Sequence, residues 1–251
     1  MASIYDSADI YDIIEDDTRY EMYVKHWEKV RGDKDICSML DVSIGTGSVT
    51  IPVLDKGISL SGSDLSESML ANCKKKIEAK GFAPDLKCSD FRNLSCWGDR
   101  TFDIVASTGN SLAFVSNEDA IRTLHEMDKH VKEGGFLYID IRNWDKIVSE
   151  KTRFYIYDPF FVGDSRLNLI QVWDHNADGT VTFNLLYTFE KENKIYRREK
   201  FEEHYIPLSK SIILKTLEEM GYHEVNVSAF PAQCKYEDIE KVDWFTILAQ
   251  K

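Results

Sequence analysis

The sequence lacks the patterns that mark several classes of protein. It has five cysteines and six histidines in 251 residues, but no C-x-x-C, H-x-x-x-H or H-E-x-x-H spacing. We therefore expect neither a metal site nor a disulfide, and we interpret the cysteines as packing residues in a reducing compartment. These residues are Cys37, Cys73, Cys88, Cys96 and Cys234.

Long apolar runs and basic clusters are also missing. No apolar run approaches the roughly eighteen residues that a membrane helix needs, and residues 1–20 lack the basic start of a signal peptide. The formal net charge is −12, and the positive residues are scattered. Nucleic acid and anionic membranes are therefore excluded as principal partners. We expect a cytoplasmic protein that acts on a small molecule.

Strand and helix patterns alternate through the first 150 residues. A helical leader is expected over residues 1–35, because apolar residues recur there at three- and four-residue spacing. Strands are expected at 36–42, 58–63, 86–89, 102–107 and 136–141, and helices at 49–56, from 66 onward, and at 118–132, where Gly134-Gly135 would stop the last helix. This alternation predicts a parallel sheet with helices on both faces.

The pattern changes after residue 150. Residues 152–157, 167–174, 180–190 and 195–205 are rich in aromatic and β-branched residues, and Asp178-Gly179 and Glu192-Asn193 look like hairpin turns. A helix at 208–220 and strands at 222–228 and 244–249 then return to the core. We predict a Rossmann-like, doubly wound, mostly parallel seven-stranded sheet with an antiparallel insertion over the active site. The expected parts are a leader (1–35), a ligand-binding core (36–150), the insertion (151–206) and a completion of the core (207–251).

The segment from Ser38 to Ser48 joins an expected strand to a glycine-containing loop. Asp41 ends the strand, and Gly45 and Gly47 follow in the loop. Glycines at such a position let a backbone approach a ligand closely, and a carboxylate after the next strand, here Asp64, can accept both hydroxyls of a ribose. A dinucleotide fingerprint needs a third glycine where this chain has Thr50. An acidic entry repels a pyrophosphate, so the pattern favours a phosphate-free, cationic nucleoside.

These residues resemble a known family. The run D-V-S-I-G-T-G at 41–47 and Asp64-Leu65-Ser66 resemble the first two motifs of class I S-adenosylmethionine-dependent methyltransferases. The segments G-N-S-L-A at 109–113 and D-I-R-N-W-D at 140–145, with Asp17-Thr18-Arg19, resemble glycine N-methyltransferases and glycine/sarcosine N-methyltransferases. Phe114 stands where glycine-specific relatives usually have histidine, which bears on the identity of the substrate.

The resemblance implies S-adenosylmethionine as cofactor and a role for each matched residue. Arg142 would clamp a substrate carboxylate, Asn110 would hold the amino acid, and Tyr5 or Tyr11 would place a hydroxyl beside the sulfonium. Asp64 would bind the ribose, Asp90 and Phe91 would flank the adenine, and Arg19 would meet the carboxylate of the cofactor. The expected cofactor site comprises Arg19, Asp41, Ser43, Gly45, Gly47, Asp64, Leu65, Met69, Asp90, Phe91, Thr108 and Gly109.

Some of these residues also have ordinary structural interpretations. Arg142 can pair with Asp145 on the surface, and Asn110 can cap the end of a strand. The aromatic residues near 154–161 can line a lid, but we interpret most of them as sheet core, with two tyrosines left as pocket residues. They are Phe154, Tyr155, Tyr157, Phe160 and Phe161.

Methyl transfer from a sulfonium is an in-line displacement, so positioning alone can supply roughly 7–11 kcal/mol of the barrier. No strong general base is then needed if the amine arrives neutral. The leading hypothesis is N-methylation of glycine or a similar small amino acid. The alternatives are a methyltransferase of amino sugars or other small metabolites and a non-catalytic S-adenosylmethionine-binding protein, whereas Asp41 and Thr50 argue against a nicotinamide-dependent oxidoreductase. The resemblance is also compatible with a homo-oligomer in which the leader of one subunit reaches the pocket of another.

Overall fold

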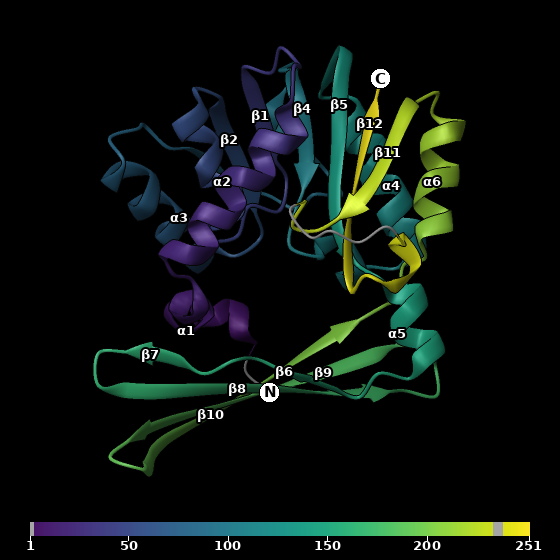
Figure 1. Ribbon diagram of the computed structural model, residues 1–251. Helices are drawn as coiled ribbons and strands as arrows, with labels where there is room; N and C mark the ends of the chain where they lie inside the picture. Colours follow the sequence, from purple (N-terminus) through teal and green to yellow (C-terminus); the bar gives the residue numbers. More distant parts are fainter. Residues whose placement is uncertain (1–2, 233–237) are drawn as a thin grey trace.

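The computed structural model describes residues 3–232 and 238–251, so Cys234 lies outside the described residues. The chain forms two sheets, one above the other in Figure 1. The larger sheet has seven strands in the order β11-β12-β5-β4-β1-β2-β3, and the smaller has five, in which β10-β9-β8-β6 form a path and β7 pairs with β8. No helix in the described ranges is long and apolar enough to span a membrane.

The larger sheet confirms the predicted fold class. Neighbouring strands from β3 to β5 run parallel, and β12 lies antiparallel to both β5 and β11. Four of the five strands expected in the first 150 residues, and both late strands, agree with the structure to within a few residues, while β5 is much longer than expected. The strands are β1 (Ser38–Asp41), β2 (Ser59–Asp64), β3 (Asp85–Cys88), β4 (Phe102–Ser107), β5 (Val131–Arg142), β11 (His223–Ala229) and β12 (Trp244–Gln250).

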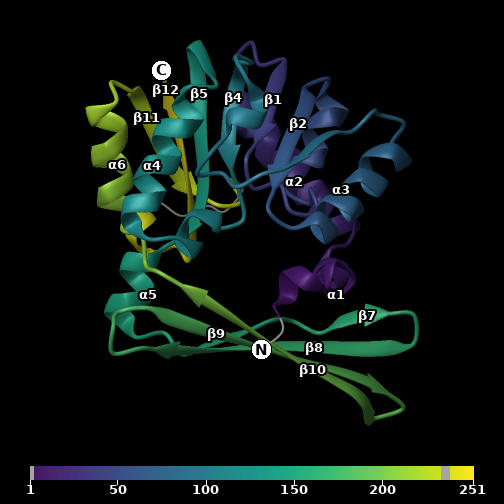
Figure 2. The ribbon, with the colours of Figure 1, turned by 180° about the vertical axis from the view of Figure 1, so that it is seen from behind.

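Helices cover both faces of this sheet (Figures 1 and 2). Met39 of β1 packs in a core with Trp27, whereas the next residue, Leu40, packs in a second core with Leu124. Successive side chains of a strand point to opposite faces, so this alternation divides the helices between the two layers. One layer contains α2 (Asp17–Arg31), α3 (Glu67–Ala79) and the 3-10 helix η3 (Ile51–Lys56), and the other contains α4 (Asn117–Asp128) and α6 (Lys210–Glu219).

The sequence pattern predicts that the Gly134-Gly135 pair stops a helix, and this prediction is wrong. Helix α4 ends at Asp128, and both glycines lie within β5. Val131 pairs with Phe102 and Phe136 with Ile104, so the residues between them form a bulge. Gly134 has φ 71°, a conformation that glycine adopts without steric cost.

Two helical expectations also need correction. The helix expected at 49–56 is the shorter 3-10 helix η3, which begins at Ile51. Helix α5 (Trp144–Glu150) was not expected; it starts directly after β5, where the Asn143 side chain accepts a hydrogen bond from the Lys146 amide. This helix carries the chain from the larger sheet to the smaller one.

The smaller sheet is antiparallel and faces the carboxyl ends of the parallel strands (Figures 1 and 2). Its strands are β6 (Phe154–Ile156), β7 (Phe160–Val162), β8 (Ser165–His175), β9 (Val181–Lys191) and β10 (Lys194–Tyr205). The interpretation of its aromatic residues as core is wrong for Phe154 and Phe161, which are 62% and 73% exposed. The packing role of the cysteines is likewise wrong for Cys37, Cys88 and Cys96, which are exposed, while Cys73 is buried.

The leader lies between the two sheets (Figure 1). It contains η1 (Ile4–Asp6), α1 (Ala8–Tyr11) and η2 (Asp12–Ile14) before α2 begins. Glu203 of β10 accepts hydrogen bonds from the Ser3 hydroxyl at 2.7 Å and the Ile4 amide at 2.8 Å. On the other side, Asp12 accepts a bond from the Thr46 hydroxyl at 2.6 Å and pairs with Lys76 at 2.9 Å. The leader is thus attached to β10 of the smaller sheet and, on the other side, to the loop after β1 and to helix α3.

Gly47 and Gly45 differ in what surrounds them. A Cβ on Gly47 would lie 2.6 Å from Ile51 Cδ1 and 2.8 Å from Cys73 Sγ, whereas a Cβ on Gly45 would meet nothing within 4 Å. Both residues have positive φ, 77° and 54°. Gly47 is therefore required by the packing of its own loop against η3 and α3.

We expect Gly47→Ala to lower the free energy of unfolding by about 2–5 kcal/mol, because left-handed strain of about 1–2 kcal/mol adds to overpacking of about 1–3 kcal/mol. Gly45→Ala is the matched control, and it should lower the free energy of unfolding only by the left-handed strain of about 1–2 kcal/mol. Denaturant unfolding of the two variants measures the difference, and equal losses would contradict the packing role of Gly47.

Candidate active site

Asp41 supports the glycine loop from behind. It is fully buried, and its carboxylate accepts hydrogen bonds from the Ser43 amide at 3.1 Å and the Thr108 hydroxyl at 2.8 Å. Burial raises the pKa of Asp41 to about 7, although the bonds from Thr108 and Ser43 oppose this shift. Asp41 thus fixes the chain reversals after β1 and β4 relative to each other.

Asp64 stands at the end of β2 and faces a cavity. Its Oδ2 accepts a hydrogen bond from the Gly45 amide at 2.8 Å, and its Oδ1 accepts one from the Ser66 amide at 2.9 Å. Burial raises the pKa of Asp64, and the backbone donors of Ser66 and Gly45 counteract this effect. The two amides orient the carboxylate, whose remaining lone pairs suit a pair of ribose hydroxyls.

The cavity beside Asp64 has a volume of about 790 Å³, and we call it the nucleoside cavity. It brings together five of the predicted cofactor residues, which are Ser43, Asp64, Leu65, Asp90 and Phe91. Leu65 is 70% exposed, an unusual position for leucine that leaves an apolar surface available to a base.

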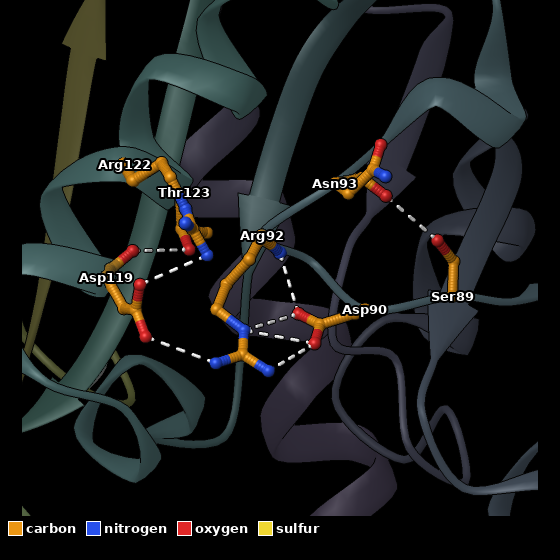
Figure 3. Close-up of polar contacts among 7 residues, drawn as sticks. All are labelled: Ser89, Asp90, Arg92, Asn93, Asp119, Arg122 and Thr123. Carbon is orange, nitrogen blue, oxygen red and sulfur yellow. Dashed lines mark hydrogen bonds and ion pairs between the residues drawn. The ribbon is translucent and has the colours of Figure 1, made fainter.

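Arg92 is the one basic residue in the described lining of the nucleoside cavity. Figure 3 shows its guanidinium held between Asp90 and Asp119, at 2.5 Å and 3.1 Å. The Arg92 side chain holds the pKa of Asp90 below its ordinary value. With Arg92 neutralised by two carboxylates, the cavity has no cation for a phosphate. It therefore fits the phosphate-free, cationic nucleoside expected from the sequence.

A second cavity of about 500 Å³ lies between the two sheets, and we call it the inter-sheet cavity. Arg142, at the end of β5, is 6% exposed there. Its guanidinium carbon lies 4.6–5.4 Å from the centroids of four rings, which belong to Tyr155, Trp173, Phe183 and Trp244. Asp145 does not pair with it; that carboxylate accepts a bond from the Lys210 amide instead. In the described part of the chain, the Arg142 guanidinium has no hydrogen-bonded or ion-paired acceptor.

Asn110 lines the same cavity in a left-handed conformation, φ 66°. Its Oδ1 accepts hydrogen bonds from the Arg142 amide at 3.1 Å and from Trp144 Nε1 at 3.0 Å. Its Nδ2 is buried and has no partner among the described residues. A buried polar group without a partner is costly, so this amide is poised to donate to a ligand.

The leader contributes three of the predicted residues. Tyr5, Tyr11 and Arg19 all line the inter-sheet cavity, and Tyr5 also lines the nucleoside cavity. Burial raises the pKa of both tyrosines well above the ordinary value, so their hydroxyls are neutral donors and acceptors. Arg19 lies 3.7 Å from Glu15 in a weak ion pair that leaves its charge available.

The remaining predicted residues differ in their positions. Gly109 lines the inter-sheet cavity and donates its amide to Asp140 at 2.8 Å. Neither described cavity lining includes Asp41, Gly45, Gly47, Met69 or Thr108, and Met69 is fully buried in the core. The Thr108 hydroxyl donates a hydrogen bond to Asp41, whereas a Cβ on Gly45 would meet no atom within 4 Å.

Sequence reasoning missed Asp140 and Glu203 as cavity residues. Asp140 is 1% exposed and Glu203 is 6% exposed, and Glu203 lines both cavities. Asp140 stands in the D-I-R-N-W-D segment, two residues before Arg142. Because alternate residues of a strand point to the same face, the sequence already indicated that Asp140 and Arg142 share a face of the sheet. Glu203 has no local signal, because its role depends on the distant Ser3 and Ile4.

Comparison with known proteins identifies a methyltransferase domain in this chain. A family model described as a methyltransferase domain matches residues 39–135. The glycine/sarcosine N-methyltransferase of Aphanothece halophytica is 28% identical over 190 residues, covering 74% of this chain and 66% of that protein. The glycine/sarcosine/dimethylglycine N-methyltransferase of Actinopolyspora halophila is 25% identical over 242 residues, covering 96% of this chain and 40% of that protein. The chain therefore matches about two thirds or less of the length of these relatives.

Solved structures support the fold. An S-adenosylmethionine-dependent methyltransferase from Clostridium acetobutylicum superposes with a TM-score of 0.77 at 20% identity, covering 98% of this chain and 97% of that one. An amino pentose methyltransferase from Micromonospora echinaspora superposes with a TM-score of 0.73 at 14% identity, covering 100% and 97%. The matched methyltransferase domain and the named methyltransferase relatives favour an enzyme over the non-catalytic binder considered above. The chain contains a methyltransferase domain with the fold of class I S-adenosylmethionine-dependent methyltransferases, and it resembles the glycine/sarcosine N-methyltransferase family.

Proposed function

We propose that this enzyme methylates the amino group of glycine or a similar small amino acid. The observation that carries the proposal is the buried Arg142 guanidinium, which has no acceptor among the described residues and lines the cavity next to the nucleoside cavity. Arginine presents its donors in a planar fork that binds a carboxylate through two parallel hydrogen bonds. An amino acid supplies that carboxylate together with the amine to be methylated.

S-adenosylmethionine, when bound, supplies a methyl group on a sulfonium as the electrophile. Asp64 would bind its ribose, Leu65 and Phe91 would contact its base, and Arg19 would meet its carboxylate. Arg142 and the Nδ2 group of Asn110 would hold the amino acid on the other side of Tyr5, which lines both cavities. The attached leader would shield the space between donor and acceptor from water, and positioning of this kind would supply much of the rate enhancement.

An amino sugar is the second candidate for the acceptor. The structural neighbour from Micromonospora echinaspora is an amino pentose methyltransferase, and its superposition includes the smaller sheet. A sugar has no carboxylate, so it would leave the Arg142 charge uncompensated. The two candidates therefore differ in their dependence on Arg142.

We expect Arg142→Lys to raise KM for glycine by about 10- to 100-fold, because charge-assisted hydrogen bonds contribute about 1.5–3 kcal/mol and lysine cannot bind bidentately. The affinity for S-adenosylmethionine should stay unchanged. Arg153→Lys is the matched control, since Arg153 pairs with Asp174 on the exposed part of the smaller sheet. Methyl-transfer assays over amino acids and amino sugars measure the effect. Carboxylate capture is refuted if the best acceptor is turned over equally by the wild type and Arg142→Lys.

We expect Asp64→Asn to weaken binding of S-adenosylmethionine by about 10- to 100-fold, because an amide accepts ribose hydroxyls less strongly than a carboxylate. The matched control is Asp103→Asn, which alters a carboxylate at the opposite end of the sheet, where it pairs with Lys132. Calorimetric titration of both variants tests this role, with NAD as a comparison ligand that the wild type should not bind. Tighter binding of NAD than of S-adenosylmethionine would contradict the assignment of the nucleoside cavity.

A further inference from the structure

Asp140 is a buried carboxyl group next to Arg142. It precedes Arg142 by two positions on β5, so both side chains leave the same face of the sheet with Cα atoms about 6.6 Å apart. Both line the inter-sheet cavity. Trp244 links them, because its Nε1 donates to Asp140 at 3.2 Å while the guanidinium carbon of Arg142 lies 4.6 Å from its ring centroid.

A chain of hydrogen bonds behind Asp140 has a fixed direction. The Ala232 amide donates to Nδ1 of His26 at 3.1 Å, so that nitrogen carries no proton. Burial lowers the pKa of His26 to about 3, so the ring is neutral and its proton is on Nε2. Nε2 lies 2.8 Å from the Tyr138 hydroxyl and donates to it. The Tyr138 proton is then left to point toward Asp140 Oδ2, at 3.5 Å.

The other neighbours of Asp140 are donors as well. Its Oδ1 accepts hydrogen bonds from the Gly109 amide and from Trp244 Nε1. The surroundings in the described structure therefore suit an anion, and a proton on this carboxyl group would have no acceptor among these contacts. Burial and the nearby Asp41 carboxylate nevertheless raise the pKa of Asp140 to about 8, although the hydrogen bond from the Gly109 amide opposes this shift. A cation in the inter-sheet cavity would relieve this conflict, because an opposite charge favours the ionised form.

We propose that Asp140 receives the ammonium group of the acceptor and takes its proton, while Arg142 holds the carboxylate of the same molecule. The role of Asp140 rests on the function proposed above and names the substrate class, which is a zwitterionic α-amino acid. In the transfer, an N–H bond of the ammonium breaks and its electron pair stays on nitrogen, while an O–H bond forms on Asp140. The amine is then neutral and can attack the methyl group. The methylated amine leaves as a cation, and Asp140 returns its proton to solvent.

Several titratable or charged groups surround Asp140. Asp41 faces it from β1, Tyr23 and His26 lie toward it from α2, and Tyr138 and Arg142 share its strand. Asp41 disfavours ionisation of Asp140, whereas Arg142 favours it. The lining of the cavity adds Glu15, Arg19, Lys146, Glu203, Lys241 and Asp243.

The test is the dependence of kcat/KM on pH, with glycine as acceptor, for the wild type, Asp140→Asn and Tyr138→Phe. For the wild type, kcat/KM should rise along an acid limb set by Asp140 and level off as the pH approaches the pKa of the amine. For Asp140→Asn we expect a loss of about 100-fold near neutral pH, within the range of general-base catalysis. This loss should shrink as the pH approaches the pKa of the amine, because only the neutral amine then reacts and no base is needed.

Tyr138→Phe removes one donor to the Asp140 anion. The acid limb should move to higher pH by about 0.4–1 unit, the equivalent of one hydrogen bond. Asp174→Asn is the matched control, because Asp174 lines neither described cavity and pairs with Arg153 at 2.8 Å on the exposed part of the smaller sheet. This variant should keep the wild-type profile.

The outcomes separate the two proposals. An Asp140→Asn profile parallel to that of the wild type at every pH, or a loss confined to S-adenosylmethionine affinity measured by calorimetry, would overturn the role of Asp140 while leaving amino-acid methylation intact. If the wild type methylates only amines without a carboxylate, the proposed substrate class fails. The pH profiles measured on those amines then still decide whether Asp140 takes the proton. Asn at position 140 keeps an acceptor for the Gly109 amide, and thermal unfolding of each variant verifies the fold.

Discussion

The buried guanidinium of Arg142 is the group around which the space between the two sheets is organised. Removing a charged group from water costs several kcal/mol, and among the described residues no carboxylate is hydrogen-bonded or ion-paired with this one. Four aromatic rings at 4.6–5.4 Å offset part of that cost through cation–π attraction. Tyr155, Trp173 and Phe183 come from the smaller sheet, whereas Trp244 comes from β12 of the larger one. The same contacts therefore hold the guanidinium and join the two sheets.

The leader completes this arrangement because it is attached both to the smaller sheet and to helix α3, which packs on the larger sheet. Glu203 accepts bonds from the Ser3 hydroxyl and the Ile4 amide, and the carbonyl of Tyr5 accepts bonds from the Ser66 and Ser68 hydroxyls at 3.1 Å and 2.9 Å. These anchors place the ring of Tyr5 at the boundary of the nucleoside and inter-sheet cavities. An in-line displacement needs the methyl donor and the acceptor amine to be close together and aligned. Tyr5 occupies that boundary as a neutral group, since burial raises the pKa of its hydroxyl.

Sequence periodicity predicted the fold well because each strand of the larger sheet has its own apolar pattern. It failed at Gly134-Gly135, where a bulge depends on how β5 pairs with β4 and not on local preference. The site followed a similar division. Asp64 and Arg142 could be proposed as site residues from the sequence because each lies in a motif at the end of an expected strand. Glu203 was missed because its partners Ser3 and Ile4 are about 200 residues away. The burial of Asp140, which changes its chemistry, likewise depends on tertiary packing.

The charges on β5 bear on the choice between an amino acid and an amino sugar. Hydroxyl groups of a sugar can accept hydrogen bonds from Arg142, but they bring no negative charge into a cavity where that cation is already desolvated. A site with a buried charged group discriminates strongly against ligands that bring no opposite charge. In such a complex the desolvation penalty of the buried charge is not offset, so binding is weaker. An α-amino acid brings a carboxylate and an ammonium together. Arg142 and Asp140 present the two opposite charges from one face of a single strand. Because one rigid strand fixes both groups, the backbone sets their spacing, and the proposed preference for a short zwitterion would follow from the geometry of β5.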